Sequence, residues 1–484
     1  MSGTPAGTVD PRTLRKTVGA SVIGTIAEYY DFFIYGTASA LVFNQIFFPE
    51  ADPLVGTLAA FSTYAVGFFA RPLGGLVWGH IGDRLGRKKA LVFTLLLTGL
   101  GTFAVGLMPT YEQIGMWAAV ILVVVRLIQG FGVGGEQGGA VLLTAEAAPQ
   151  KRRGFYASFV QLGSPVAYLI PTALFAGLQQ WMDEDAFLAW GWRVPFLLSI
   201  VVVAVGLYIR SKVDESETFK AARERKAESH APLRQLFGQR RREVLGGFFA
   251  KFVEAAMFPF YTIFLVAYAD NNGYSSGLVL EAVIIAILVE IVMIPVWGHV
   301  TDRIGRRPVF LALAVLNLVL IVPAFLAVQT ENLAVITALL VVGLGLGHSG
   351  TYAPQASFFP ELFDSSVRYS GVSVVWQFGA MVASGPFTVV ATALLVAADG
   401  GFWLVAGYTA LLVVCSIVAL VALPETAPAR RGGQEYASWP ALDGAASDDL
   451  AGPGRHDLPP HVRRSSSPST SPSSSPVGRN PHLR

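Results

Sequence analysis

The chain has 484 residues, of which 53% are hydrophobic and only 14% carry a charge. This balance excludes an ordinary soluble domain, in which about a quarter of the residues are charged. The net charge is +2 and the basic residues are dispersed among many short segments, so no nucleic-acid partner is expected. A single cysteine, Cys415, excludes an intramolecular disulfide.

The apolar residues are grouped in blocks long enough for an α-helix to cross a bilayer. Only helices and closed barrels satisfy their backbone hydrogen bonds in lipid, and the alternating segments of a barrel do not occur. The sequence therefore predicts an all-α membrane protein. Twelve transmembrane helices are expected at residues 17–43, 54–81, 90–108, 114–143, 155–178, 192–210, 243–269, 277–298, 308–328, 332–358, 369–396 and 401–423.

Outside the predicted spans, Lys and Arg occur only in the N-terminal segment and in every second segment after it. The six intervening loops contain neither residue. Because positively charged loops stay on the cytoplasmic side, we expect a multi-pass protein of the cell (plasma) membrane with both termini in the cytoplasm.

The charge pattern also divides the chain into five parts. Residues 1–16 form a polar cytoplasmic segment, and 17–210 and 243–423 form two six-helix bundles. The charged segment 211–242 is expected to be a cytoplasmic linker between them. Residues 424–484 are rich in Ser and Pro and too polar to form a core, so they are predicted to be a disordered tail.

Two loop features occur once in each half. The sequence GHIGDRLGRK at 79–88 recurs as GHVTDRIGRR at 298–307, which is 219 residues later. The second feature, an acid followed by an arginine and repeated after 215 residues, comprises Glu146, Arg153, Glu361 and Arg368. Repetition at matching spans indicates a duplicated six-helix unit.

The repeated loops are expected to interlock at the cytoplasmic face and so to act as a gate. Their glycines permit a tight turn, and their aspartates can meet the positive end of a neighbouring helix. Their arginines can pair with an acid such as Glu146 or Glu361. Topology alone would explain the basic residues but not the repeated Asp and Gly. The gate residues expected are Gly79, Asp83, Arg84, Gly86, Arg87, Glu146, Gly298, Asp302, Arg303, Gly305, Arg306, Glu361 and Arg368.

Charged residues inside the spans of the first half share helix faces. Arg126, Gln129 and Glu136 recur at helical spacing in the fourth span, and the six glycines at 130–139 allow another helix to pack closely. In the first span Glu28 and Asp31 lie on the face of Tyr35. Charges inside a membrane usually face a wet cavity or an opposite charge, so a structural ion pair is the alternative to a functional site.

The second half carries intramembrane charges of its own. Lys251 and Glu254 lie three residues apart in the seventh span, where a structural pair explains them as well as a functional one. Glu290 in the eighth span matches Arg71 in the second span, with opposite sign. His348 in the tenth span could titrate, but packing is the favoured interpretation.

Several of these segments resemble a known family. The loop at 79–89 looks like the signature between the second and third helices of the major facilitator superfamily, and RLIQG at 126–130 resembles its fourth-helix motif. Segments that look like the metabolite:proton symporter family within it are AEYYDFFIYG (27–36), FFARPLGGLVWGHIGDRLGRKKA (68–90), GGEQGGAVLL (134–143), RRGFYASFVQLG (152–163) and GWRVPFLLS (191–199). The resemblance implies twelve transmembrane helices in two pseudo-symmetric halves. It also implies symport of protons with a small organic acid (shikimate, 2-oxoglutarate, citrate) or a zwitterion (proline, glycine betaine).

We therefore expect a monomeric transporter with a central cavity between the halves, with no cofactor, no metal and no enzymatic activity. Proton coupling is expected from Glu28, Asp31, Glu136 and Arg126. Substrate binding is expected from Arg71, Arg126, Tyr35, Gln129, Gln161, Lys251, Glu254 and Glu290. A passive facilitator or channel, or a non-transporting sensor on the same fold, remains an alternative. Tyr29 and Gln137 stand where the family often has Trp, so the substrate stays open.

Overall fold

A computed structural model describes residues 11–85, 87–133, 141–142, 144–146, 148–212, 236–238, 240–364 and 367–427. Within these ranges it leaves out the side chains of residues 11–17, 20, 28, 75–76, 79–91 and 209–212. The described residues belong to one compact unit, Thr8–Trp439. The expected site residues that lie outside this description are Glu28, Glu136, Gly79, Asp83, Arg84, Gly86 and Arg87.

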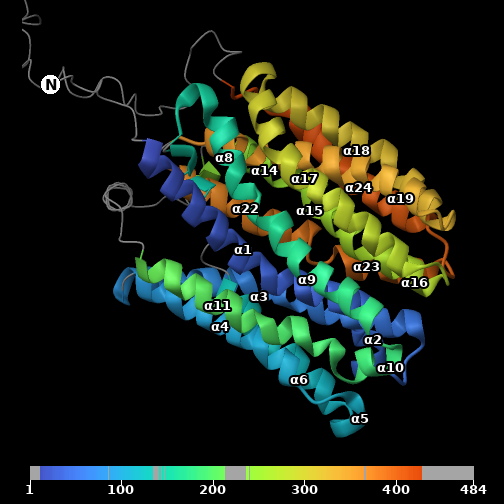
Figure 1. Ribbon diagram of the computed structural model, residues 1–484. Coiled ribbons are helices and arrows are strands. Elements are labelled where there is room, and N and C mark those ends of the chain that lie inside the picture. Colours follow the sequence, from blue (N-terminus) through green and yellow to red (C-terminus); the bar gives the residue numbers. More distant parts are fainter. Residues whose placement is uncertain are drawn as a thin grey trace, which may run out of the picture. The chain divides into compact units, whose positions relative to one another are not determined.

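The described residues fold into helices without a strand, as the apolar blocks predict (Figure 1). The long helices of the first half are α1 (Pro11–Leu41), α3 (Pro53–Leu85), α4 (Arg87–Leu107), α6 (Trp117–Val133), α8 (Arg153–Gln161), α9 (Gly163–Trp181) and α11 (Arg193–Lys212). Short segments join them: α2 (Phe43–Phe47), α5 (Tyr111–Ile114), η1 (Gln150–Arg152), α10 (Glu184–Ala186) and η2 (Phe187–Gly191).

The second half repeats this plan. Its helices are α14 (Arg241–Ala250), α15 (Phe252–Pro259), η3 (Phe260–Phe264), α16 (Leu265–Asn271), α17 (Ser276–Ile304), α18 (Arg306–Gln329), α19 (Leu333–Leu340), η4 (Val341–His348), α20 (Ser349–Tyr352), α21 (Gln355–Glu361), α22 (Arg368–Ala383), α23 (Phe387–Ala397) and α24 (Trp403–Ala422). Among them η3 and η4 are π-helical segments inside longer continuous helices.

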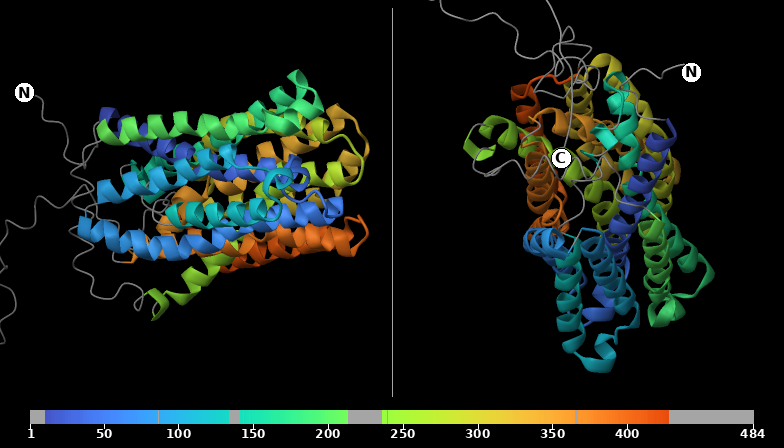
Figure 2. Two further views of the ribbon diagram at one scale, coloured as in Figure 1. Left: turned by 90° about the horizontal axis from the view of Figure 1, so that it is seen from below. Right: turned by 90° about the vertical axis from the view of Figure 1, so that its left-hand side faces the viewer.

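Nine helical stretches of the described chain are long and apolar enough to cross a membrane. Two shorter apolar helices, Val92–Leu107 and Trp117–Val133, fall in the third and fourth predicted spans. The 31-residue helix α1 covers the first. The predicted and observed elements therefore correspond span by span, and the helices run alongside one another (Figure 2).

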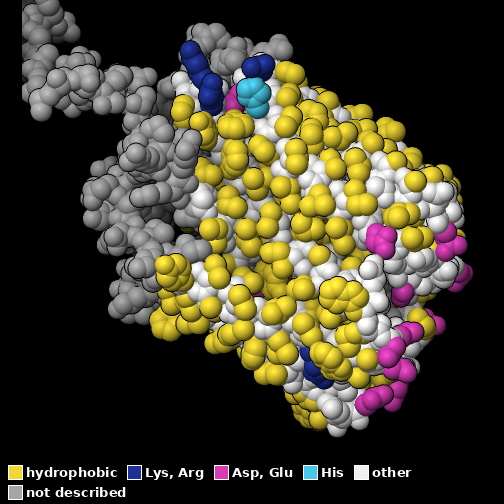
Figure 3. Space-filling model, in the orientation of Figure 1, with side chains coloured by type: hydrophobic (Ala, Val, Ile, Leu, Met, Phe, Trp, Pro, Cys, Tyr) yellow, Lys and Arg dark blue, Asp and Glu magenta, His cyan; other side chains and the backbone are white. Residues whose placement is uncertain are grey.

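The outside of the bundle is apolar between its two ends. Hydrophobic side chains cover the middle of the face in Figure 3, and acidic side chains gather at the end where α2, α10 and α16 lie. Trp117, Trp181, Trp190 and Trp403 are exposed close to that end of their helices. Tryptophan favours the interface between lipid and water. Together the apolar middle of this face and the exposed tryptophans indicate a surface that faces a bilayer.

The two halves touch along several helices. In the contacts between halves, α17 packs along α8 and α9, and α23 packs against α3. Tyr168 of α9 donates a hydrogen bond of 2.6 Å to the carbonyl of Thr262 in η3. Nearer the acidic end Asn271 donates to the hydroxyl of Thr57 at 3.3 Å. The space between these contacts and those at the other end holds the candidate site.

Candidate functional site

A cavity of about 50 Å³ lies between the two halves. Residues of α1, α3 and α9 form one wall, and residues of α15, η3 and α22 form the other. The charged lining residues in the described part are Arg71, Lys251 and Glu254. Aromatic lining residues are Tyr29, Phe32, Phe33, Tyr64, Phe68, Phe258 and Trp376. A space of this size holds a few water molecules, so its walls must move to admit a metabolite.

The two arginines predicted at this site both contact one aromatic ring, that of Phe32. The guanidinium carbon of Arg71 is 3.6 Å from the centroid of Phe32. That of Arg126, whose side chain is fully buried, is 4.4 Å from the same centroid. Arg71 lines the cavity and Arg126 does not. Phe32, which lines the cavity, therefore contacts both an arginine in the lining and an arginine outside it.

Close helix packing holds Arg126 in place. A Cβ atom on Gly67 of α3 would lie 2.8 Å from its Nε, and one on Gly130 of α6 would lie 2.1 Å from the Gly67 carbonyl oxygen. Only glycine fits at such a crossing, as the glycine-rich fourth span predicts. The rings of Tyr35 and Tyr64 lie 4.4 and 5.2 Å from the guanidinium carbon.

A polar chain connects Arg126 with Asp31. The buried Asp31 carboxylate lies close to the hydroxyl groups of Thr98 and Thr102 of α4 and within electrostatic reach of Arg126. Gln129 donates to the Thr102 hydroxyl at 2.7 Å and accepts from Arg126 at 3.5 Å. The Nε and Nη2 atoms of Arg126 have no hydrogen-bond partner among the described residues. Asp31 and Arg126 thus form one electrostatic unit behind the cavity wall.

The second half places a different ion pair at the cavity. Lys251 pairs with Glu254 and donates a hydrogen bond of 3.0 Å to Gln355. Its Nζ atom lies 4.6 Å from the centroid of Trp376. The ion pair between Lys251 and Glu254 accounts for their position on one helix face. Glu254 also lines the cavity.

Four residues predicted at the substrate site lie behind the cavity wall: Tyr35, Gln129, Gln161 and Glu290. Gln161 donates a hydrogen bond of 3.2 Å to the Tyr352 carbonyl in the other half. Glu290 is bonded to His348, with 2.7 Å between Oε1 and Nδ1. These residues support the wall or the contact between halves, and they do not face the cavity.

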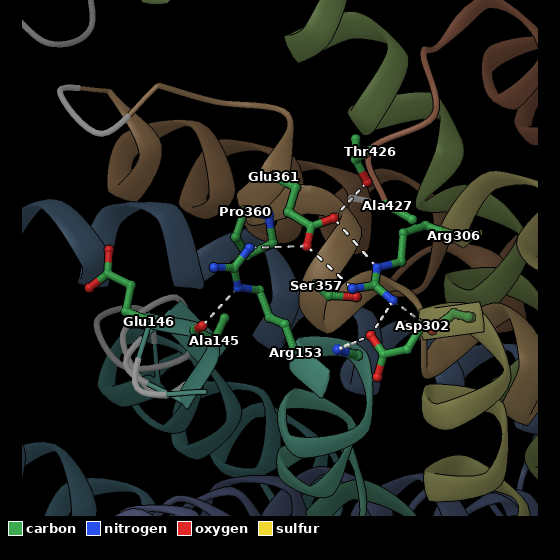
Figure 4. A network of polar contacts seen from close by, with 12 residues as sticks. Ala145, Glu146, Arg153, Asp302, Arg306, Ser357, Pro360, Glu361, Thr426 and Ala427 are labelled. Atoms are coloured by element: carbon green, nitrogen blue, oxygen red, sulfur yellow. Dashed lines mark hydrogen bonds and ion pairs between the residues drawn. The ribbon is translucent and has the colours of Figure 1, made fainter. Parts of the chain in front are cut away.

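We call the end of the bundle with residues 145–158 and 298–307 the basic end. Here Asp302 of the second repeated loop accepts hydrogen bonds of 2.9 Å from the backbone N–H groups of Gly154 and Phe155 (Figure 4). These groups belong to the first turn of α8, so the aspartate meets the positive end of a helix in the other half. Arg306 completes the contact by donating to Asp302 at 2.6 Å and to Glu361 at 3.4 Å.

The repeated acid and arginine pair across the halves in a reciprocal way. Arg153 of the first half binds Glu361 of the second, and Arg368 of the second binds Glu146 of the first, each at 3.5 Å. Each arginine also donates through Nε to a carbonyl eight residues earlier at 3.1 Å. The duplicated sequence thus produces two equivalent bridges that join the halves. Arg303, also expected in the gate, is exposed.

The start of the predicted tail needs a correction. Glu425 accepts hydrogen bonds from the backbone N–H groups of Arg306 and Arg307 at 2.9 and 3.1 Å, and so caps α18. Thr426 donates to Glu361 at 2.7 Å and is buried (Figure 4). Residues 424–427 are therefore ordered, because hydrogen bonds to residues far away in the chain fix a segment whose composition alone predicts disorder. The tail beyond them lies outside the described residues.

Replacing Gly298 by Leu is expected to open the basic end. A Cβ there would lie 2.7 Å from the Gly154 carbonyl oxygen, so the halves must separate. The measurement uses a background in which Ser164 in the cavity lining is replaced by Cys and Cys415 by Ser. Labelling of this cysteine by an impermeant maleimide from the basic side should rise about tenfold, because the substitution makes a minor open state dominant. The matched control is Gly407→Leu, where a Cβ meets nothing within 4 Å. Equal labelling in both variants would contradict a gate at this position.

Two features of the site were missed although the sequence contains a signal for them. Thr94, Thr98 and Thr102 recur every four residues in the third span, which places a polar stripe on one helix face. The reciprocal bridges were not predicted as such, because pairing within each half fits the repeat equally well.

The fold and the cavity together define a membrane transporter built from two six-helix bundles. The model of the Major Facilitator Superfamily matches residues 21–385 and 245–466, and the chain belongs to this superfamily. The shikimate transporter of Escherichia coli (strain K12) is 36% identical over 423 residues, which cover 86% of this chain and 95% of that protein. The proline/betaine transporter of the same strain is 31% identical and is matched over 87% of this chain and 85% of its own length.

The solved structures agree with this assignment of the fold. A partially occluded, inward-open structure of the xylose transporter XylE from E. coli superposes with a TM-score of 0.65 at 19% identity, over 85% of this chain and 98% of XylE. The resemblance to metabolite symporters is thereby confirmed at the level of the family. The chain is a multi-pass membrane transporter of metabolites and not an enzyme.

Proposed function

We propose that the chain is a proton-coupled symporter that imports a small metabolite with one carboxylate. The observation that carries this proposal is the cavity between the halves with Arg71, Lys251 and Glu254 in its wall. Lys251 pairs with Glu254, and the guanidinium of Arg71 is the second cation in the described lining. A guanidinium matches a carboxylate in shape and in charge. Aromatic walls suit the ring of a shikimate-like acid or the cationic end of a betaine.

In this proposal the proton binds to Asp31. When Asp31 is ionised, it balances the charge of Arg126 through the chain of hydroxyl and amide groups between them. When Asp31 is protonated, the positive charge of Arg126 beside Phe32 is left uncompensated and attracts an anion in the cavity. Proton and substrate therefore favour each other's binding, with a coupling free energy of typically about 1–3 kcal/mol.

Alternating access supplies the remaining step. The bridges at the basic end hold the halves together. From the distribution of Lys and Arg, this end and both termini would lie in the cytoplasm. Rocking of one half against the other exposes the cavity to each side in turn. The buried ion pairs must break when this end opens, and substrate and proton together provide the differential binding that the change requires.

A transport panel tests this function. Purified protein in liposomes is given radiolabelled shikimate, proline, glycine betaine or citrate under an inward pH gradient, with and without a protonophore. We expect a substrate with one carboxylate to accumulate against its gradient and the protonophore to abolish the accumulation, whereas citrate is excluded by its extra charge. A passive facilitator would equilibrate every substrate without accumulation, and transport of citrate alone would contradict the proposed substrate class.

A further inference from the structure

A buried acid and a buried imidazole meet inside the second half, away from the cavity lining. Glu290 lies in the middle of α17, and His348 ends the π-helical segment η4. Their exposed fractions are 0% and 1%, and Nδ1 of His348 is 2.7 Å from Oε1 of Glu290. π-Helical segments inside α-helices occur frequently at functional sites. From the sequence, packing was the favoured role of His348 and substrate binding that of Glu290. Neither role accounts for this contact.

The second polar atom of each side chain is left unsatisfied. Oε2 of Glu290 and Nε2 of His348 are buried and have no hydrogen-bond partner among the described residues. An ionised carboxylate beside a neutral imidazole would place an unbalanced negative charge in the membrane interior, which is costly. One added proton makes the pair neutral overall, whichever of the two groups holds it. The two unsatisfied atoms are positions at which a proton or a water molecule can enter.

Few charged groups act on the pair. Besides His348, the charge that reaches Glu290 is that of Glu254 on α15, which itself pairs with Lys251. The helices α9 and α19, which also pack against α17, contain no charged residue. The charged residues of α8 and α18 are arginines at the basic end. There they pair with acids or donate hydrogen bonds to backbone carbonyls. Asp270 of α16 and Lys151 and Arg152 of η1 also belong to helices that contact α17, and none of them forms an ion pair with Glu290 or His348. Among the described residues no permanent counter-charge pairs with Glu290, and a proton is the simplest way to neutralise the pair.

A layer of hydroxyl-bearing and aromatic side chains separates the pair from the cavity. The ring of Tyr352 stacks on His348 with 5.5 Å between centroids, and its hydroxyl interacts with Tyr29 and Ser164. Both of these line the cavity. The ring of Phe258, which also lines the cavity, lies 5.1 Å from the His348 ring. The Tyr352 hydroxyl thus connects to the cavity lining, and a water molecule at the unsatisfied Nε2 or Oε2 atom would complete a route for a proton to the pair.

We propose that Glu290 and His348 form a second proton-binding site, which takes up and releases one proton in each transport cycle. The inference rests on the proposed symport and extends it, because Asp31 in the first half and this pair in the second would then load two protons with one substrate. The two sites occupy comparable places, each one side chain behind the cavity wall.

The number of protons fixes how far a substrate can be concentrated. With the membrane potential clamped at zero, each coupled proton multiplies the limiting substrate ratio about tenfold per unit of pH gradient. The experiment measures the substrate ratio at which net flux vanishes, in liposomes with a gradient of about one pH unit, using whichever labelled compound of the panel the wild type accumulates. This ratio is independent of the amount of active protein, so partial loss of folded protein does not alter it.

Glu290→Gln and His348→Gln are compared with wild type and with Glu112→Gln, an exposed glutamate on α5. We expect the zero-flux ratio to fall about tenfold in both site variants and to stay unchanged in the control. An unchanged ratio in Glu290→Gln and His348→Gln would overturn the second site while leaving the symport intact. A wild-type ratio of about one would instead refute proton coupling altogether.

If both variants are inactive, proton binding by the substrate-free protein in detergent decides the question. Between about pH 9 and about pH 5, the wild type should take up about one proton more than a Glu290→Gln/His348→Gln variant that elutes as the same monodisperse species. Equal proton uptake would show that the pair is a fixed structural link.

Discussion

The Asp31→Asn variant is expected to exchange substrate across the membrane but to lose most of its proton-driven accumulation. Asparagine has nearly the same shape, so its side chain can still lie close to the hydroxyl groups of Thr98 and Thr102. It can neither release a proton nor balance the charge of Arg126, and the site therefore behaves as if it were permanently protonated. The accumulation ratio should fall about tenfold per unit of pH gradient, the contribution of one coupled proton.

The measurement compares counterflow with net uptake in liposomes. Counterflow needs no proton movement and should remain close to that of the wild type in Asp31→Asn. Combining this change with Glu290→Gln should remove the remaining accumulation, because both proposed proton sites are then fixed. Loss of counterflow and uptake to the same degree would mean that Asp31 is needed only for the structure. Normal accumulation in Asp31→Asn would remove it from the mechanism.

The second large effect is expected when Arg71 is replaced by Leu. Arg71 is one of the two cations in the described cavity lining, and the other, Lys251, pairs with Glu254. A hydrogen-bonded contact between charged groups contributes about 1.5–3 kcal/mol, so the apparent affinity for a carboxylate substrate should fall about 10- to 100-fold. Arg71→Lys should fall between Leu and wild type, because a point charge replaces a planar fork.

Binding to the purified protein, followed by tryptophan fluorescence or by calorimetry, gives this affinity. The matched control is Arg241→Leu, since Arg241 is exposed at the start of α14. Arg71 also packs on Phe32 and Phe68, so thermal unfolding must be measured for each variant. A methyl ester of the substrate should bind Arg71→Leu and wild type equally. If the ester discriminates between them as strongly as the free acid does, Arg71 does not bind the carboxylate.

The fold could be predicted from the sequence because the membrane imposes simple rules on it. Apolar blocks fix the spans, and charged loops fix where they end. The ninth span, predicted at 308–328, is observed as Arg306–Gln329. The repeat of the loop at 298–307 and of Glu361 with Arg368 indicated two related halves before any contact was known. Short polar segments were harder, because the order of residues 424–427 depends on hydrogen bonds to partners far away in the chain.

The site was predictable only in part. The helical spacing of Arg126 and Gln129 placed them on one buried face, and both side chains are buried. Sequence spacing within a helix says nothing about which neighbour that helix faces. The contact between Glu290 and His348 joins residues 58 positions apart on two helices, and only packing brings them together. The same limit applies to Phe32, whose contacts with two arginines depend on how α1, α3 and α6 cross.

The most direct test of coupled transport follows protons and substrate together. Liposomes that contain the protein and a pH-sensitive dye receive the substrate from outside, with no initial pH gradient and with the membrane potential clamped at zero. The account predicts that wild type acidifies the lumen as substrate enters and that Asp31→Asn acidifies it less for the same uptake. Entry of substrate into wild-type liposomes without any change in luminal pH would contradict it.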